Sequence, residues 1–322
     1  MNHQNKKFLT IAIPTYNGAS SYLKVVLDHL LPVLKEREDV EIVVSDNCST
    51  DHTIDLLSNY EKYDGFRYHR QMENVGFKNN MLFIINNMVS SEYCWFVGDD
   101  DILLPNAVNE VMSFLKDSNV DYLKMGYKRI LPDEINDVNK NLTKPIFKIG
   151  SYANAIEDGC FEGNAFATFM SSSVFRVKPF LKHSLNFIDD GKDMFYNTFP
   201  NAYLIAKSFC NSVCGYSNCQ LVFPIIRNKD WAKSEKLYKI NSIYLLDFYN
   251  YLLSLNVSRY DLRNTKRRIL FLNIESGIIR YKNKEKVAPI FWKSVFTSIV
   301  YPSVCFKIIR EVFGHFSKKK TK

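Results

Sequence analysis

The sequence lacks the short motifs that mark several common enzyme classes. None of its 12 glycines belongs to a G-x-G-x-x-G or Walker loop, which argues against a nicotinamide-dependent dehydrogenase and a P-loop enzyme. Its six histidines are scattered, without an H-E-x-x-H metal site. Its seven cysteines include no C-x-x-C pair, so they predict neither a disulfide framework nor a zinc ribbon, and reduced thiols in a cytosolic chain fit best.

Long apolar runs of the kind that cross or enter membranes are also missing. The uncharged stretch between Lys293 and Lys307 contains Pro302 and is shorter than the ~20 apolar residues of a spanning helix. The first apolar run, residues 8–13, is too short for a signal-peptide core and has no small-residue cleavage site behind it. Hydrophobic residues make up 46% and charged residues 24%, which is ordinary for a globular chain. We therefore expect a cytoplasmic protein that is soluble or bound to a surface.

The first third of the chain alternates between strand and helix patterns. This alternation implies right-handed crossovers and a mainly parallel sheet with both faces covered, and such sheets bind ligands at the carboxyl ends of their strands. Polar loops at residues 15–18, 45–51 and 98–101 fall at those ends, so we expect them to converge on one cleft. The predicted strands are residues 8–13, 40–44, 66–69 and 93–97, and the predicted helices cover about residues 22–34, 54–60, 76–88 and 108–115.

Carboxylates in two of these loops can carry chemistry. Asp99, Asp100 and Asp101 follow a buried strand, and their mutual repulsion would be relieved by a magnesium or manganese ion shared with a substrate diphosphate. The alternative is an exposed turn that caps the helix beginning near Pro105. Asp46 can accept a hydrogen bond from a base or ribose, or it can simply cap the next helix.

Four segments together resemble the family 2 glycosyltransferases of the GT-A fold. They are residues 13–18 (IPTYNG), 41–51 (EIVVSDNCSTD), 74–76 (NVG) with Asn80, and 95–105 (WFVGDDDILLP). Their order and spacing match the family, and bacterial O-antigen, capsule and cell-wall sugar transferases look most similar. The resemblance covers residues 8 to about 210 and is specific over the first 105.

The resemblance implies roles for individual residues. A divalent cation, Mn²⁺ or Mg²⁺, would be bound by Asp100, and Asp99 would approach the ribose. The residues expected around the nucleotide and its diphosphate are Pro14, Tyr16, Asn17, Asp46 (facing the base) and Asp101 (near the diphosphate and sugar). The chain departs from many relatives at Gly98, where they have Asp, and at Asn79, where they often have a basic residue.

The resemblance also places a catalytic base about 90 residues after the metal motif. The carboxylates available there are Asp189, Asp190 and Asp193, of which Asp190 is favoured, although the usual Glu-Asp signature is missing. An inverting transfer needs one carboxylate to take the acceptor hydroxyl proton. A cation stabilises the departing nucleoside diphosphate. The alternative role of Asp190 is that of a helix N-cap.

The rest of the chain differs in composition. We expect a catalytic domain over residues 1–215, with a nucleotide-sugar half (1–120) and an acceptor half (121–215), followed by a helical, basic region over residues 216–322. Aromatic residues at 291–296 and the lysines that follow would suit an anionic membrane surface, although an amphipathic helix docked on the catalytic domain or an oligomer contact explains them too. Nucleic acid is not an expected partner, because the cleft loops are acidic.

These observations predict a cytoplasmic, metal-dependent, inverting glycosyltransferase. Its donor would be a nucleotide-diphosphate sugar and its acceptor a glycan or a lipid-linked glycan of a bacterial surface polysaccharide. Two alternatives stay open at this point: a non-catalytic nucleotide-binding scaffold of the same fold, and a sugar-nucleotide nucleotidyltransferase. The second usually has a Gly-rich basic loop after its first strand, and residues 14–18 lack one.

Overall fold

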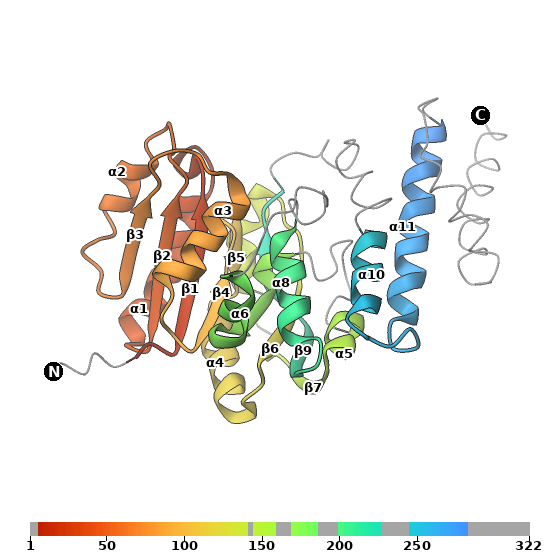
Figure 1. Ribbon diagram of the computed structural model, residues 1–322. Coiled ribbons are helices and arrows are strands. Elements are labelled where there is room, and N and C mark those ends of the chain that lie inside the picture. Colours follow the sequence, from red (N-terminus) through yellow and green to blue (C-terminus); the bar gives the residue numbers. More distant parts are fainter. Residues whose placement is uncertain (1–5, 141–143, 159–168, 186–198, 227–244, 283–322) are drawn as a thin grey trace. The chain divides into compact units, whose positions relative to one another are not determined.

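A computed structural model describes residues 6–140, 144–158, 169–185, 199–226 and 245–282 (Figure 1). The chain divides into two compact units, residues 1–227 and 228–322. The expectations for Asp189, Asp190 and Asp193, and those for the aromatic and basic segment after residue 290, lie outside the described residues.

The first unit is built on a nine-stranded sheet in the order β3-β2-β1-β4-β8-β6-β9-β5, with β7 paired to β9. Strands β1, β2, β3 and β4 pair parallel with one another. Strand β8 pairs antiparallel with both β4 and β6. The strands are β1 (Leu9–Thr15), β2 (Val40–Asp46), β3 (Phe66–Arg70), β4 (Tyr93–Phe96), β5 (Asp101–Leu103), β6 (Tyr122–Tyr127), β7 (Lys148–Ser151), β8 (Ser173–Arg176) and β9 (Val213–Pro224).

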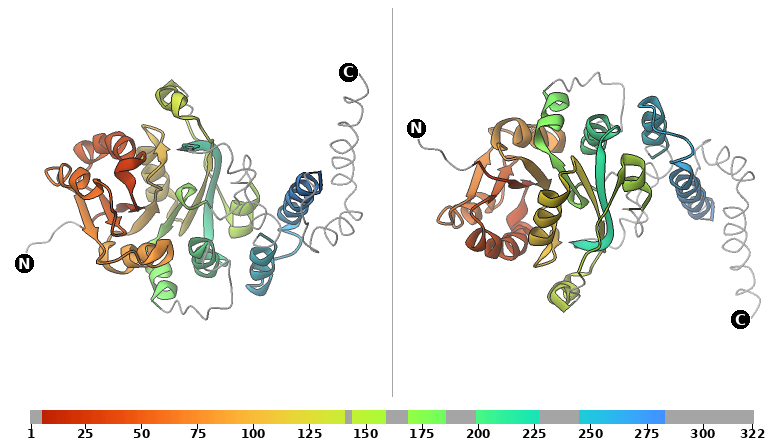
Figure 2. Two further views of the ribbon diagram at one scale, coloured as in Figure 1. Left: turned by 90° about the horizontal axis from the view of Figure 1, so that it is seen from above. Right: turned by 90° about the horizontal axis from the view of Figure 1, so that it is seen from below.

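Helices cover both faces of this sheet, with α3, α6 and α8 on one side and α1 and α4 on the other (Figures 1 and 2). The helices are α1 (Leu23–Glu36), α2 (Thr53–Ser58), α3 (Gly76–Phe83), α4 (Ala107–Ser118), α5 (Tyr152–Asp158), α6 (Val177–Ser184) and α8 (Pro200–Phe209). Shorter turns are η1 (Gly18–Ser20), the π-helical η2 (Ile84–Met88), η3 (Pro132–Lys140) and η4 (Met170–Ser172).

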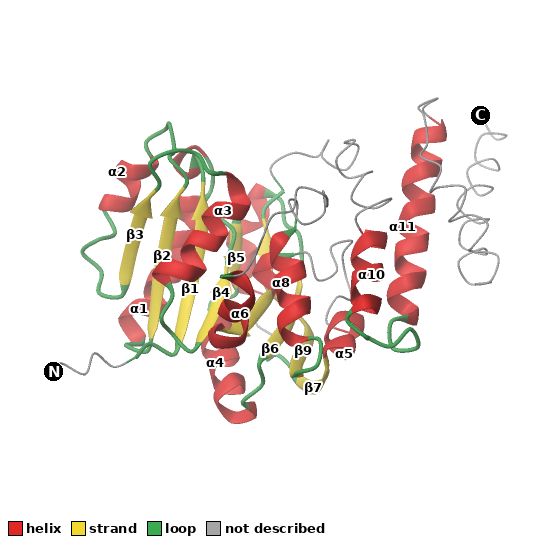
Figure 3. Cartoon of the chain, in the orientation of Figure 1, coloured by secondary structure: helices red, strands yellow, loops and turns green. Residues whose placement is uncertain are grey.

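The core explains why the central strands read as unbroken apolar runs. Every residue of β1, β2 and β4 is buried, as expected for strands covered on both faces. Helix α1 buries Leu23, Val26, Leu27, Leu30 and Val33, a spacing that places them on one face of the helix. The alternating fold predicted from the sequence is confirmed (Figure 3).

Strand β9 links the acidic loop to the rest of the sheet. Its first part pairs with β6, and its last part pairs antiparallel with β5. Between these parts the register with β6 shifts twice around Gly126, so that residues 217–219 of β9 bulge past this glycine. The backbone N–H of Ile225, directly after β9, donates to the carbonyl oxygen of Asp100 at 2.9 Å. The bulge therefore aligns the end of β9 with the loop that carries the three aspartates.

The described part of the second unit consists of α10 (Leu245–Ser254) and α11 (Arg263–Lys282). Helix α10 buries Leu245, Phe248, Tyr249 and Leu252, the face that its sequence spacing predicts. Among the residues that the structure describes, no helix is long and apolar enough to cross a membrane.

Candidate active site

The three polar loops predicted to converge do so at the carboxyl ends of β1, β2 and β4. Parallel register places Thr15 beside Asp46 and Ala12 beside Phe96, so the loops that follow these strands emerge together. They border a cavity of about 440 Å³. The cavity is lined by Pro14, Thr15, Tyr16, Asn47, Asn74, Gly76, Phe77, Asn80, Gly98, Asp99, Asp100 and Met170.

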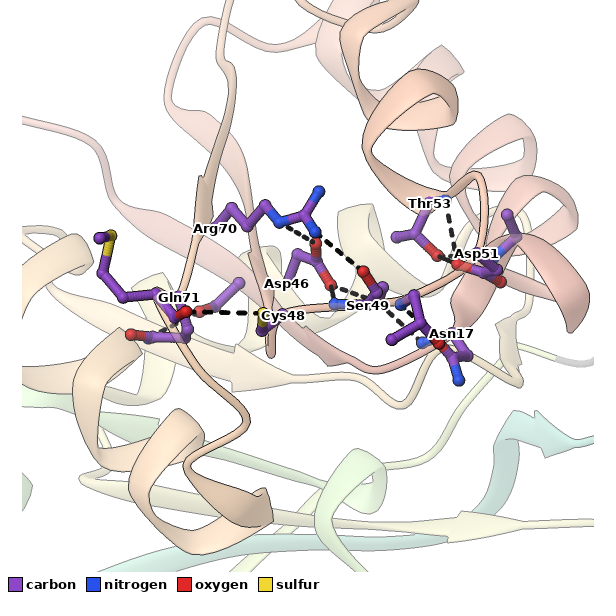
Figure 4. A network of polar contacts seen from close by, with 12 residues as sticks. Asn17, Asp46, Cys48, Ser49, Asp51, Thr53, Arg70 and Gln71 are labelled. Carbon is purple, nitrogen blue, oxygen red and sulfur yellow. Dashed lines mark hydrogen bonds and ion pairs between the residues drawn. The ribbon is translucent and has the colours of Figure 1, made fainter.

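Asp46 lies at the end of β2 and is completely buried. Its Oδ1 accepts hydrogen bonds from the backbone N–H of Ser49 (3.0 Å) and from the Ser49 hydroxyl (Figure 4). Its Oδ2 has no hydrogen-bond partner among the described residues, and the Nε of Arg70 lies 3.8 Å away. Buried polar atoms are normally hydrogen-bonded, so this oxygen keeps an unused capacity to accept a hydrogen bond, although Asp46 is not one of the residues that line the cavity.

Asn17 shapes the neighbouring loop from a left-handed conformation, with φ of 56°. Its Oδ1 accepts from the backbone N–H of Thr50 (2.8 Å), and its own N–H donates to the Ser49 hydroxyl (2.8 Å) (Figure 4). The start of α2 is held instead by Asp51, whose Oδ1 accepts from the backbone N–H of Thr53 at 3.0 Å. Asn17 thus braces the loops on β1 and β2 against each other, and Asp51, not Asp46, makes the side-chain hydrogen bond to the start of α2, whose N-cap residue is His52.

The three consecutive aspartates occupy different places. Asp99 lines the cavity, and its Oδ2 accepts a hydrogen bond from the Thr15 hydroxyl at 2.7 Å. Asp100 also lines the cavity. Asp101 begins β5, is only 4% exposed and is not one of the lining residues. The structure therefore brings Pro14, Tyr16, Asp99 and Asp100 to one cavity and places Asp101 behind it.

Burial raises the pKa of Asp101 to about 7, and the nearby charges of Asp100 and Asp99 add to the rise. Hydrogen bonds from Ser171 and from the backbone of Gly98 oppose it. This concentration of acidic charge beside a cavity is the electrostatic setting that a cation relieves.

The donor atoms present suit a cation shared with a substrate. The described residues contain no cluster of three or more acidic, histidine or cysteine side chains that could hold a metal by themselves. Magnesium and manganese at phosphate sites need only one or two carboxylates, because phosphate oxygens and water complete the coordination. Two aspartates lining the cavity meet that requirement.

Aromatic rings and amides complete the cavity. Tyr16 and Phe77 are 45% and 44% exposed, so both rings present a large apolar surface at its edge. Asn47 is held in place by Asn74 and by the backbone of Val75, at 2.8 and 3.0 Å. This wall of the cavity is therefore fixed by amides before a ligand enters.

Several residues at this site escaped the sequence reasoning. The sequence shows Thr15 only as part of a turn, and the apolar pattern of residues 166–175 predicts a strand that would include Met170 and Ser171. That expectation is wrong for the described part, because the strand β8 begins only at Ser173 and is preceded by the turn η4. Serine hydroxyls in η4 make hydrogen bonds that an extended strand would not allow, and the run of three serines was the available signal.

Comparison with known proteins gives the family. Its sequence profile, described as "Glycosyl transferase family 2", matches residues 10–182, which is more than half of the chain. The chain is 25% identical to the abequosyltransferase RfbV of Salmonella typhimurium over 255 residues, covering 76% of this chain and 73% of the relative. It is 22% identical to the poly(ribitol-phosphate) beta-N-acetylglucosaminyltransferase TarP of Staphylococcus aureus over 247 residues, covering 72% of each.

Solved structures agree on the fold. A mannosyltransferase from Pyrobaculum calidifontis, in complex with GDP-Man and Mn²⁺, superposes with a TM-score of 0.57 at 12% identity and covers 99% of this chain and 83% of that one. TarS of S. aureus, in complex with UDP-GlcNAc, gives a TM-score of 0.50 at 15% identity and covers 89% of this chain and 90% of that one. The GT-A fold expected from the sequence is confirmed, and the chain belongs to glycosyl transferase family 2, as a nucleotide-sugar-dependent glycosyltransferase.

Proposed function

We propose that this glycosyltransferase moves a sugar, with inversion and with the help of a divalent cation, onto a glycan or lipid-linked acceptor in bacterial surface polysaccharide synthesis. The observation that carries the proposal is the cavity of about 440 Å³ at the ends of three parallel strands, which is lined by Asp99, Asp100 and Tyr16. A cavity of this size accommodates a small-molecule ligand, and its acidic edge accounts for a cation.

The nucleotide would lie along the ends of β1 and β2. Tyr16 presents its exposed ring to the base, and the Oδ2 of Asp46, which is ion-paired with Arg70 but has no hydrogen bond, accepts a base N–H once the Arg70 side chain, which is 39% exposed, makes room. Asp99, oriented by Thr15, accepts from a ribose hydroxyl. Pro14 restricts the backbone at the end of β1, and Asn17 holds the loop that follows against the loop after β2.

Asp100 would hold the cation against the diphosphate. A bound cation neutralises the charge that develops on the departing nucleoside diphosphate. Asp100 contributes one carboxylate at the cavity, and its carbonyl oxygen is tied to the end of β9. Asp101 stays behind the loop, where it acts on the loop's shape.

The base that deprotonates the acceptor hydroxyl is proposed to be Asp190, with Asp189 and Asp193 as the other available carboxylates. An inverting transfer requires only this base and the leaving-group stabilisation, without a covalent intermediate.

The names of the relatives support the acceptor class. One relative is an abequosyltransferase, and others act on poly(ribitol-phosphate) or on an undecaprenol-linked glycan. An undecaprenol-linked acceptor lies at a membrane, which suits the expected contact of the basic C-terminal region with an anionic membrane surface. Deleting residues 290–322 and measuring liposome flotation tests that contact, and unchanged flotation would refute it.

Donor turnover tests the transferase itself. The purified chain is incubated with UDP-, GDP-, CDP- and dTDP-sugars, and the release of nucleoside diphosphate is followed with Mn²⁺ or with EDTA. We expect one donor class to be consumed, and only with Mn²⁺. We also expect NMR to show that the sugar product forms first with the anomeric configuration opposite to that of the donor. Asp100→Asn should abolish turnover, whereas Asp117→Asn, a change of an exposed aspartate on α4, should not.

Turnover that persists in EDTA would contradict the role of the metal, and a retained anomeric configuration would contradict inversion. If the fold is intact but no donor is consumed, and Asp100→Ala leaves surface polysaccharide unchanged in the source cell, the chain is a scaffold and the proposed transfer is wrong.

A further inference from the structure

The loop between β4 and β5 presents two aspartates to the cavity and withdraws the third. Asp99 and Asp100 line the cavity, whereas Asp101 is 4% exposed. Three adjacent carboxylates repel one another, so a specific set of contacts is needed to keep them in different places.

Those contacts come from one serine of η4. The Ser171 hydroxyl donates to Oδ2 of Asp101 and accepts from the backbone N–H of Gly98 at 2.9 Å. The same N–H also lies 3.2 Å from Oδ2 of Asp101. A hydroxyl has one proton and two lone pairs, so it can make both bonds at once. The backbone N–H of Asp101 also donates to the carbonyl oxygen of Gly98 at 3.2 Å, so the two ends of the loop are bonded to each other directly and are bridged in addition by Ser171.

The turn that carries Ser171 is itself held on the sheet. The indole N–H of Trp95, on β4, donates to the carbonyl oxygen of Ser171 at 2.7 Å. The ammonium group of Lys124, on β6 and completely buried, donates to the hydroxyl of Ser172 and lies 3.4 Å from the carbonyl oxygen of Phe169. Ser171 is therefore a fixed point to which the loop is attached.

The attachment also needs a residue without a side chain at position 98. A Cβ on Gly98 would lie 2.5 Å from Oδ2 of Asp101 and 3.2 Å from Oδ1 of Asp100. The first distance is too short for a non-bonded contact, so any other residue would displace the Asp101 carboxylate from Ser171. Gly98, Asp101 and Ser171 depend on one another.

We infer that Ser171 is a positioning residue: it binds Asp101 behind the loop and so orients Asp99 and Asp100 toward the cation and the nucleotide. The inference rests on the proposed function, and it assigns Asp101 to the loop's shape and not to the ligand. Removing one partner of a buried hydrogen bond leaves the other polar group unsatisfied, so the loss of this bond is measurable.

Mn²⁺ binding provides a test that does not depend on turnover. MnCl₂ is titrated calorimetrically into the full chain in the presence of saturating UDP, GDP, CDP or dTDP, in parallel. The variants are Ser171→Ala, Asp101→Asn, Asp100→Asn and the control Ser184→Ala. Ser184 is also a buried serine, but its hydroxyl donates to Asn86, away from the acidic loop. Melting temperatures without metal report on folding.

We expect Ser171→Ala to weaken Mn²⁺ binding about tenfold, since it leaves the buried side chain of Asp101 without this hydrogen-bond donor. Asp101→Asn keeps an oxygen acceptor for Ser171 and should stay within about threefold of the wild type, because the hydrogen bond is kept. Asp100→Asn should abolish Mn²⁺ binding, and Ser184→Ala should bind Mn²⁺ with the affinity of the wild type.

Two results would overturn the inference while leaving the proposed function intact. One is wild-type Mn²⁺ affinity in Ser171→Ala, and the other is a loss in Asp101→Asn as large as that in Asp100→Asn, which would make Asp101 a ligand. If Ser171→Ala does not fold, the comparison of Asp101→Asn with Asp100→Asn decides. If the wild type binds Mn²⁺ with none of the nucleotides, the proposed function fails, and the inference fails with it.

Discussion

Replacing Gly126 by alanine tests whether the bulged pairing of β6 with β9 is required for stability. A Cβ at this position would lie 2.5 Å from the carbonyl oxygen of Asn218 and 2.8 Å from that of Cys219. Both atoms belong to the backbone of β9, which cannot rotate away as a side chain can. Strands β6 and β9 would have to separate by several tenths of an ångström at this point.

The cost can be estimated from known substitutions. Overpacking an interior site destabilises a protein by about 1–3 kcal/mol, and a severe backbone contact belongs at the upper end of that range. Alanine recovers about 0.4–1 kcal/mol by restricting the unfolded chain. We therefore expect Gly126→Ala to lower the free energy of unfolding by about 2 kcal/mol, or the melting temperature by about 4–8 °C.

Urea unfolding of the full chain, followed by circular dichroism, measures this change. The matched control is Gly150→Ala on β7, where the new Cβ would meet only the side chain of Asn154, at 2.8 Å. That side chain can move, so the control should cost less than half as much. A urea midpoint for Gly126→Ala equal to that of the wild type would contradict this prediction, because it would show that the backbone of β9 adjusts freely to a side chain at position 126.

Two further predictions concern titratable groups. Hydrogen bonds from Arg37, assisted by Lys116, lower the pKa of Asp39 to about 2. A carboxyl whose pKa is lower in the folded state stabilises the protein above its unfolded pKa of 3.8 and loses that effect as the pH falls toward 2. Asp39→Asn should therefore lower the free energy of unfolding by about 1 kcal/mol at pH 7, a value reduced because the Asp39 side chain is 34% exposed. Near pH 2 the substitution should have no effect. Urea titrations at the two pH values measure this, and an equal loss of stability at both would contradict the prediction. Burial raises the pKa of the Cys94 thiol, so iodoacetamide should label Cys94 only after unfolding. The partly exposed Cys48 should be labelled in the native protein, and peptide mass spectrometry distinguishes the two sites. Labelling of Cys94 in the native protein would contradict this prediction and show that β4 opens.

The sequence predicted the parts of the fold that local pattern determines. Apolar runs identified β1, β2 and β4, and the polar residues after them identified the loops that line the cavity. These predictions succeed because periodicity and strand ends are local properties, and because parallel sheets gather the carboxyl ends of their strands.

The missed features depend on contacts between distant residues. Strand β5, which begins at Asp101, exists because it pairs with β9, more than 100 residues later. Ser171 reaches Asp101 across 70 residues of sequence, and Arg70 comes beside Asp46 only when β3 pairs with β2. A triplet of aspartates therefore predicted acidic chemistry, but it did not show which carboxylate would turn away.

The most direct test of the central claim is the thermal stability of the purified protein with nucleoside diphosphates. UDP, GDP, CDP and dTDP are each added with and without Mn²⁺, to the wild type, to Asp100→Ala and to the control Asp117→Ala. A ligand that binds the native state raises the melting temperature, and saturation at about 100 times its dissociation constant adds about 2.7 kcal/mol. We expect one diphosphate to stabilise the wild type and the control in the presence of Mn²⁺ only, and Asp100→Ala to lose this effect. Stabilisation that is the same in Asp100→Ala, or absent with all four diphosphates, would contradict it.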